Sequence, residues 1–527
     1  MRAVADAPKK LTTWQSIQRS FTSWRLASVT LLSFPSGMPL GLVLTSIPFW
    51  MQQEGIDIKT IGWLQLAGLP YSFKFIWSPL MDRYAPPNAR RRGWIAIFQV
   101  VLTLVCTAFA IEAGGPRVAM VAVLTFALSF ASASQDIAID AYAVEVLEPD
   151  ERGAAVGARA AVYRVAMYLA GATLITASAH VGWRLSYAVI AVLFLATLVL
   201  TFFAAEPPAP AKPPVSLRAA VWDPFVGFFR HSNALQIAAF LFFYKLADNL
   251  AQALIRPFLG QMGFSADDIG LGTAVVGVFA TLVGTFIGGV VTTGMGLGRA
   301  LWLFGFVQII ANAGYALLAQ VGVNRPLMYA AMGVEAAASG MGAGAMGVLL
   351  LAITQKRFSA TQFALFSSIF ALGRTLSGPP AGVLADALGW RNFFLLTMPV
   401  GIPGLLLLHS FSPWGKWDIA PPPAEGEGGA VGEPRSLGNV IARGLAGAVL
   451  GTGVGYLVNA TLAALKAVRA QKIPFNLAGG FDRLFHPPRP VDWVDVVSPP
   501  VLGLIIGFSV AAYLTARHGL RRAHPTA

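Results

Sequence analysis

Apolar runs long enough to cross a membrane alternate with short polar stretches along most of the chain. A bilayer core requires about 20 mainly apolar residues in a helix. The first half contains six such runs, at about 26–50, 60–81, 94–112, 118–143, 155–178 and 184–204. Six more lie at about 234–257, 268–291, 299–319, 326–354, 361–385 and 391–411, followed by two candidates at about 440–464 and 498–516. The pattern predicts an all-α membrane protein with about fourteen transmembrane helices.

Two polar stretches rich in proline divide these runs into larger units. We predict an N-terminal cytoplasmic arm at 1–25, a six-helix bundle at 26–205 and a cytoplasmic linker at 206–232. A second six-helix bundle at 233–411, a linker at 412–437, and two additional transmembrane helices with a cytoplasmic tail at 438–527 complete the organisation.

The two predicted bundles resemble each other in sequence. GIDIKTIG from Gly55 recurs as GFSADDIG from Gly263, a shift of 208 positions. GWRLSY from Gly182 recurs as GWRNFF from Gly389, a shift of 207. Two matches at nearly one offset indicate a duplicated, pseudo-symmetric unit. Repeats of this kind place a substrate cavity at their interface, near the middle of the membrane.

Composition and charge agree with a membrane protein. Hydrophobic residues make up 56% of the chain and charged residues only 12%, too few to cover a soluble surface. The formal net charge is +13, but the basic residues stand in short loops, where they set membrane orientation. We therefore expect a lipid bilayer and no nucleic acid as partner. The single cysteine, Cys106, excludes an internal disulfide framework.

Basic loops predict that both termini are cytoplasmic, because Lys and Arg are enriched in cytoplasmic loops. The relevant residues are Arg83, Arg90, Arg91, Arg92, Lys356, Arg357, Arg517, Arg521 and Arg522. The topology of the last two helices stays open, because the segment between them is also basic, with Lys466, Arg469, Lys472, Arg483 and Arg489.

The end of the second span carries charges that suit a gate. The run GLPYSFKFIWSPLMDRY begins at Gly68 and carries an acid and a base directly before its last residue, Tyr84, and further arginines follow. This run resembles the signature loop of major facilitators, in which an acid and nearby arginines latch the two halves in one state. The resemblance implies a cytoplasmic gate of Asp82, Arg83, Arg91, Arg92, Glu145 and Arg152. The alternative is that these residues only mark the membrane interface.

The fourth span holds two acids in the run SQDIAIDAY from Ser134. At 100° per residue, Asp136 and Asp140 project within about 40° of each other and share one helix face. An ionised Asp within a bilayer costs at least about 2.5 kcal/mol, so each should face a wet cavity or a cation. We predict proton coupling at Asp136, the deeper acid, with a fixed ion pair to Lys74 or Arg164 as the structural alternative. Asp140 is a second candidate for proton coupling, but its place near the cytoplasmic end favours membership in the gate.

The seventh span carries a polar stripe, whose members fall within about 60° of one line along the helix. These residues are Lys245, Asp248, Asn249, Gln252 and Arg256. We expect the stripe to line the transport path, where Lys245 and Arg256 can bind anionic groups of a substrate. An internal ion pair between Lys245 and Asp248 is the alternative. Further candidates for substrate binding are Lys74, Gln135, Tyr163, Arg164 and Arg374, and Glu335 is an intramembrane acid without an assigned partner.

Three motifs together resemble those of the AmpG-type muropeptide permeases, a major facilitator family related to acetyl-coenzyme A transporters. They are GLPYSFKFIWSPLMDRY, SQDIAIDAYAVEVL with the following ERG, and YKLADNLAQALIRPFLGQMGFSADDIG from Tyr244. The resemblance implies the major facilitator fold and proton-driven import of anhydro-muropeptides, products of cell-wall turnover, across the bacterial inner membrane. The substrate would be a small amphiphilic or anionic sugar-peptide, and the proton gradient would supply energy without a cofactor.

Two other functions remain as alternatives. A transporter could carry another anion, such as a coenzyme A thioester. A non-transporting membrane scaffold or sensor would have no need for intramembrane charge, which the polar stripe contradicts. An enzyme is not expected, because no metal-ligand, triad or phosphate-loop spacing is recognisable. A monomer is expected, although a ridge of Gly447, Gly451 and Gly455 would suit either an intramolecular contact or a dimer.

Overall fold

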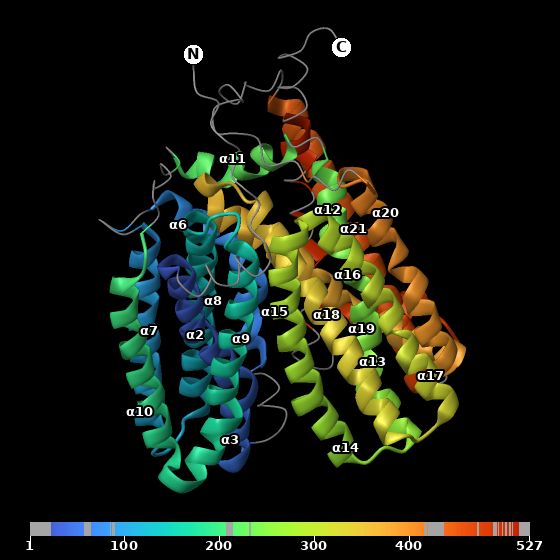
Figure 1. Cartoon of the computed structure of the whole chain (residues 1–527), viewed down its shortest axis with the longest axis horizontal. Coiled ribbons are helices and arrows are strands. Elements are labelled where there is room, and N and C mark those ends of the chain that lie inside the picture. The colour runs from blue at the N-terminus through green and yellow to red at the C-terminus, as the bar shows by residue number, and fades with distance from the viewer. Residues whose placement is uncertain are drawn as a thin grey trace.

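The computed structural model describes residues 23–56, 65–84, 86, 90–206, 214, 216–230, 233–415, 419, 437–471, 474–487, 493, 495–497, 499–500, 503–504, 507 and 510–515. Within these residues all regular structure is helical. Figure 1 shows two helical bundles side by side, with a further pair of helices against the second. Most of the predicted N-terminal arm, residues 1–22, and most of the linker at 412–437 lie outside the described residues.

The first bundle is built from five long helical segments and one broken segment. The long segments are α2 (Trp24–Gly41), α7 (Arg90–Glu112), α8 (Val118–Val146), α9 (Arg152–Tyr168) and α10 (Leu174–Phe203). The first continues through η1 (Leu42–Ser46) into α3 (Ile47–Gln53), and η4 (Leu169–Thr173) joins α9 to α10. The broken segment is η2 (Gln65–Gly68), α5 (Leu69–Phe73), η3 (Lys74–Ile76) and α6 (Ser78–Arg83). Pro70 and Pro79 stand in the first turns of α5 and α6, since proline starts a helix but cannot continue one.

The second bundle follows a short helix, α11 (Leu217–Phe229), which lies across one end of the molecule in Figure 1. The bundle consists of α12 (Ala234–Phe243), α13 (Leu246–Met262), α14 (Ala266–Leu271), η5 (Gly272–Gly277), α15 (Val278–Met295), α16 (Leu297–Ala311), α17 (Ala313–Val321), α18 (Arg325–Ile353), η6 (Lys356–Phe358), α19 (Ser359–Val400) and α20 (Ile402–Phe411). One of its hydrophobic clusters contains Phe258, Tyr315 and Phe394, and a second contains Phe240, Phe304 and Phe366.

The glycines of the sequence repeat adopt the same backbone conformation in both bundles. Gly55 and Gly263 end helices with φ of 77° and 95°. Gly182 and Gly389 turn the chain within α10 and α19 with φ of 76° and 72° and an equal ψ of 162°. Only glycine adopts positive φ without strain. The matched glycines therefore mark equivalent turns of a duplicated unit.

Each repeat also closes the same hydrogen bond between distant helices. Trp183 Nε1 donates to Gln53 Oε1 at 2.9 Å in the first bundle. Trp390 Nε1 donates to Gln261 Oε1 at 3.0 Å in the second. The two tryptophans directly follow the repeat glycines Gly182 and Gly389. The two glutamines stand two positions before the repeat glycines Gly55 and Gly263. Local sequence similarity thus extends to the tertiary contacts of the two halves.

The number of membrane crossings stays a prediction. Nine helices within the described residues are long and apolar enough to cross a membrane. One of them, 152–203, contains two predicted spans joined through Gly182. The second predicted span is broken into short helices, and the seventh is divided between α12 and α13 at Tyr244 and Lys245. Only parts of the last predicted span are described.

The two C-terminal helices pack against each other inside one chain. Glycines of α21 (Leu437–Gln471) approach the following helix closely, and a Cβ at Gly447 or Gly455 would lie 3.2 Å from Val510 or 2.8 Å from Pro499. Gly447 and Gly455 of the glycine ridge therefore make a contact within the chain, which is one of the two alternatives predicted for the ridge. A short helix not expected from sequence, α22 (Leu477–Phe485), lies between them. Lys472, Arg489, Arg517, Arg521 and Arg522, used to predict orientation here, lie outside the described residues.

The bundles meet closely where α9 crosses α15. A Cβ built on Gly153 would lie 2.1 Å from the carbonyl oxygen of Gly289, and one on Gly157 would lie 2.6 Å from Phe286. Small residues let helix backbones approach in this way. The crossing lies near the start of α9, toward the end of the bundles that carries α6 and α11 (Figure 1). This is the predicted cytoplasmic end.

Candidate functional site

Arg91, in the first turns of α7, connects acids from two other helices of the first bundle. Its Nη2 lies 2.6 Å from Asp82 Oδ1, and its Nε lies 2.8 Å from Glu145 Oε1. The three side chains are at most 3% exposed. Arg91 Nη1 also donates to the carbonyl oxygen of Met81 at 2.9 Å. Two buried acids share one arginine, so further donors must stabilise their remaining charge.

The second bundle supplies those donors from the first turn of α19. Ser359 Oγ accepts from Arg91 Nη2 at 2.8 Å and donates to Glu145 Oε1 at 2.6 Å. The backbone N–H groups of Ala360 and Thr361 donate to Asp82 at 3.2 and 2.8 Å. A helix N-terminus leaves its first N–H groups free and favours negative charge. We call these six residues, Asp82, Arg91, Glu145, Ser359, Ala360 and Thr361, the gate network.

Three arginines predicted for the gate are placed elsewhere. Arg83 stacks on the ring of Tyr84, with 5.4 Å from its Cζ to the ring centroid. Arg92 pairs with Glu206 and donates to the carbonyl oxygen of Ala204 at 2.8 Å, at the end of α10 in its own bundle. Arg152 does not pair with Glu145 among the described ion pairs, and its buried Nε has no described hydrogen-bond partner. Adjacent helix positions differ by 100°, so Arg92 cannot follow Arg91 into the network.

Inside the first bundle, Asp140 is held by two cations. Arg159 Nη2 lies 2.6 Å from Asp140 Oδ1, and Lys74 Nζ lies 3.5 Å from Oδ2. Arg159 Nε also donates to Ser33 Oγ at 3.0 Å. Lys74, considered as an ion-pair partner of Asp136, is thus paired with Asp140, and the second cation is Arg159 rather than Arg164. The described contacts of Asp140 do not include any residue of the gate network, so the expected membership in the gate is not seen. Asp140 lies more than one helical turn before Glu145, which is too far to share its partners.

Asp136 lies one turn from Asp140 on the same face of α8 and has a different kind of partner. Its carboxylate accepts a hydrogen bond from the Ser36 hydroxyl on α2. Lys74 and Arg159 interact with it electrostatically, as they do with Asp140. The predicted sharing of one face by the two acids is therefore seen. We call Lys74, Asp136, Asp140 and Arg159 the N-terminal cluster.

In the second bundle, Lys245 is buried and fully occupied. It stands at the break between α12 and α13, and its Nζ lies 2.6 Å from Asp248 Oδ2. The same Nζ donates to Gln308 Oε1 at 2.9 Å and to Ser339 Oγ at 2.7 Å. This arrangement matches the alternative of an internal ion pair. A substrate anion cannot reach Lys245 in this conformation without displacing these partners.

Gln252 connects the Lys245–Asp248 ion pair to Glu335, the intramembrane acid for which the sequence suggested no partner. Its Nε2 donates to Glu335 Oε1 at 2.8 Å and to Ser339 Oγ at 2.9 Å. Glu335 is 5% exposed and lies one turn before Ser339 on α18. Two predicted stripe residues, Lys245 and Gln252, thus contact polar groups from two other helices. We call Lys245, Asp248, Gln252, Gln308, Glu335 and Ser339 the C-terminal cluster.

The other predicted substrate-binding residues are less enclosed. Arg256 and Arg374 are exposed, and Tyr163, Arg164 and Asn249 are half-buried. Asn249 faces α19, where a Cβ on Gly373 would lie 3.4 Å from its Nδ2. Gln135 is buried without a described hydrogen-bond partner for either side-chain atom, and it points away from the face that carries Asp136. For these residues, a role in substrate binding stays a prediction.

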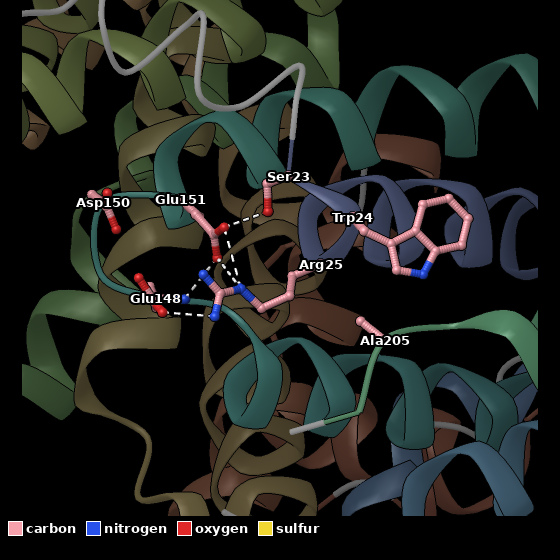
Figure 2. A pocket seen from close by; sticks show the side chains of 7 residues that line it. All are labelled: Ser23, Trp24, Arg25, Glu148, Asp150, Glu151 and Ala205. Carbon is pink, nitrogen blue, oxygen red and sulfur yellow. Dashed lines mark hydrogen bonds and ion pairs between the residues drawn. The ribbon is translucent and has the colours of Figure 1, made fainter. Parts of the chain in front are cut away.

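Figure 2 shows a pocket of about 440 Å³ at the predicted cytoplasmic end of the first bundle. Arg25 Nη1 lies 2.6 Å from Glu148 Oε1, and Arg25 Nε lies 3.3 Å from Glu151 Oε2. The Ser23 hydroxyl donates a hydrogen bond to Glu151. These contacts hold the start of α2 against the turn between α8 and α9. The pocket contains none of the predicted site residues, so it is not the predicted transport path.

Sequence reasoning missed Arg159 and the polar groups of α16, α18 and α19. A signal for Arg159 was available, because only the short turn at 147–151 separates the end of α8 from the start of α9. Asp140 and Arg159 are nearly equidistant from the middle of that turn. No comparable local signal joins Ser339 to Lys245 or Thr361 to Asp82, since long chain segments separate them.

Comparisons with known proteins agree on a transporter. The model of the Major Facilitator Superfamily matches residues 29–377. The chain is 40% identical over 393 residues to the anhydromuropeptide permease of Escherichia coli K12, covering 74% of this chain and 80% of that protein. It is 29% identical over 405 residues to the putative transporter AmpG 4 of Rickettsia conorii, covering 74% and 97%.

Solved structures support the fold alone. The human organic anion transporter MFSD10 (TETRAN) aligns with a TM-score of 0.55 at 14% identity, over 73% of this chain and 99% of that chain. The proton:xylose symporter XylE aligns with a TM-score of 0.53 at 13% identity, over 73% and 96%. The two-bundle arrangement is therefore shared with major facilitator transporters of different substrates.

Proposed function

Since the chain belongs to the Major Facilitator Superfamily, we propose that it imports anhydromuropeptides across the bacterial inner membrane, driven by the proton gradient. The observation that carries the substrate class is the 40% identity to a permease named for that substrate, over most of both chains. Its relatives are transporters and not enzymes. We propose that no cofactor takes part.

The chemistry of the interior supports a polar, partly anionic substrate. A sugar-peptide presents carboxylates, amides and hydroxyls. Arg256 and Arg374 come from α13 and α19 of the second bundle and are exposed, and Arg164 of the first bundle is half-buried. Arginine binds carboxylates in a planar, two-point geometry, so these three side chains are the candidates for substrate carboxylates.

The gate network supports alternating access. It joins the bundles at the predicted cytoplasmic end through buried ion pairs and the first turn of α19. In a rocking-bundle transporter, such a contact holds one state and must break to open the other side. We propose that the conformation described here is closed toward the cytoplasm.

The proton-coupling groups are proposed from intramembrane acids. Asp136 is held by a neutral hydroxyl, whereas Asp140 is ion-paired. A carboxyl with a neutral partner can lose or gain a proton without breaking an ion pair. We therefore propose Asp136, in preference to Asp140, as a proton carrier.

Uptake into right-side-out membrane vesicles tests the proposal. Radiolabelled anhydromuropeptide should enter right-side-out vesicles that contain the protein, and an imposed inward proton gradient should concentrate it. Vesicles without the protein and vesicles treated with a protonophore are the controls. Robust uptake of a coenzyme A thioester with no uptake of anhydromuropeptide would instead assign the chain to a different anionic substrate.

A further inference from the structure

The N-terminal and C-terminal clusters have the same design but differ in charge balance. In the N-terminal cluster two acids, Asp136 and Asp140, stand beside two cations, Lys74 and Arg159. In the C-terminal cluster two acids stand beside the single cation Lys245. If every group is ionised, the first cluster is neutral and the second has one excess negative charge.

The excess charge falls on Glu335. Lys245 contacts Asp248 directly at 2.6 Å, and its other described partners are neutral oxygens of Gln308 and Ser339. The described partner of Glu335 is the neutral amide of Gln252. A buried carboxylate without a paired cation is costly in protein and in a bilayer. Protonation removes that cost without disturbing the Lys245–Asp248 pair.

No neighbouring helix brings a compensating cation to Glu335 in the described structure. From the start of α13, Lys245 and Asp248 act on it together, and Tyr315 of α17 interacts with it electrostatically. The packed helix α15 contains no ionisable residue, and α16 contributes neutral Gln308 to the cluster. On α9, Arg159 is paired with Asp140. On α19, exposed Arg374 makes no described ion pair with Glu335.

We propose that Glu335 is a second proton carrier of the transport cycle, and that Gln252 connects its protonation to the substrate path; this inference rests on the proposed function. Glu335 holds a proton on its carboxyl in the conformation described here. When the second bundle opens to water, the O–H bond breaks, the proton passes to a water molecule and the carboxylate remains. Gln252 lies one turn from Arg256 on the exposed side of α13, so a substrate bound there senses the charge of Glu335 through this amide.

Infrared difference spectroscopy of the purified protein tests the proton directly and needs no substrate. Wild-type protein should show protonated-carboxyl C=O absorption that disappears as pH is raised, and Glu335→Gln should lack the part of that band that belongs to Glu335 while the part from Asp136 remains. The side-chain amide introduced by this substitution keeps an oxygen that accepts from Gln252, so the variant should fold. Glu54→Gln, which changes an exposed acid, should leave the band unchanged. A band of equal size in Glu335→Gln overturns the proposal.

Vesicle transport separates this proposal from the proposed function. Glu335→Gln should still exchange labelled for unlabelled anhydromuropeptide at a measurable rate, while its accumulation ratio under a proton gradient should fall to about one. Accumulation equal to wild type overturns the role of Glu335 and leaves the proposed function intact. Absence of uptake by wild-type protein overturns the proposed function, and the infrared band then still decides whether Glu335 holds a proton.

Discussion

Asp82 and Thr361 are 279 positions apart in the chain, yet the Thr361 side chain and backbone both bind one carboxylate oxygen of Asp82. Thr361 Oγ1 donates to Asp82 Oδ2 at 2.6 Å, and Thr361 N donates to the same oxygen at 2.8 Å. Asp82 is fully buried. This contact joins the two bundles at the predicted cytoplasmic end.

Removing the charge of Asp82 should favour opening at this end. Asp82→Asn keeps the shape but weakens the bonds to Arg91 and to the α19 N-terminus, and breaking a buried ion pair typically costs about 3–5 kcal/mol. In a Cys106→Ala background, Ala364→Cys, at the buried bundle interface, should then react at least tenfold faster with a membrane-impermeant maleimide from the cytoplasmic side. Arg83→Gln, outside the gate network, is the matched control, and equal reactivity of both variants would contradict the gate.

Asp140 and Asp136 should differ in their contribution to stability. Asp140→Asn leaves Lys74 and Arg159 without their direct ion pair, which should lower the free energy of unfolding by about 3 kcal/mol or more. Asp136→Asn removes the charged acceptor of one hydroxyl hydrogen bond, at a cost of about 1 kcal/mol. Thermal unfolding in detergent compares the two variants. A larger loss for Asp136→Asn would refute this assignment.

Asp136→Asn should uncouple transport from the proton gradient. The amide cannot take up and release a proton, but it keeps an acceptor for the Ser36 hydroxyl. We expect gradient-driven accumulation of anhydromuropeptide to be lost while exchange persists. The vesicle assay measures both rates on the same preparation, and normal accumulation would end the proton-coupling role of Asp136.

The glycine crossing of α9 and α15 should tolerate no side chain in the closed state. Gly153→Ala places a methyl group 2.1 Å from the Gly289 carbonyl oxygen, so the bundles must separate and transport should fall at least tenfold. Gly260→Ala is a matched helical control with open space around it, and it should be neutral or slightly stabilising, because Ala favours helix by about 1 kcal/mol over Gly. Transport rates normalised to expression test the pair; full activity of Gly153→Ala would show that the crossing is not rigid.

Arg256 and Lys245 should respond differently to truncation. Arg256 is exposed and is absent from the described ion pairs, so Arg256→Ala should weaken substrate affinity about tenfold or more with little change in expression. Lys245→Ala leaves Asp248 buried without its cation, so it should reduce expression and thermal stability. Substrate binding by the purified variants, alongside expression yield, distinguishes the two; unchanged affinity in Arg256→Ala assigns that residue to structure.

Several features of this protein follow from the sequence alone because their causes are local. Long apolar runs require a lipid environment whatever their packing, and the comparisons confirm the family that the motifs at Gly68, Ser134 and Tyr244 indicate. The repeat at Gly182 and Gly389 is visible because a positive φ demands glycine wherever the chain makes that turn. Helix periodicity likewise placed Asp136 and Asp140 on one face.

The partners of the charged side chains were decided only by tertiary packing. Helical periodicity shows that Lys245 and Asp248 share a face, but only packing against α16 and α18 shows that Gln308 and Ser339 occupy the remaining donors of Lys245. In the same way, Asp82 finds the N-terminus of α19 because two bundles meet there, a contact between parts of the chain that no local pattern connects. An ion pair depends on distance in space, and the packing of whole helices, rather than the residues beside it in the chain, sets that distance.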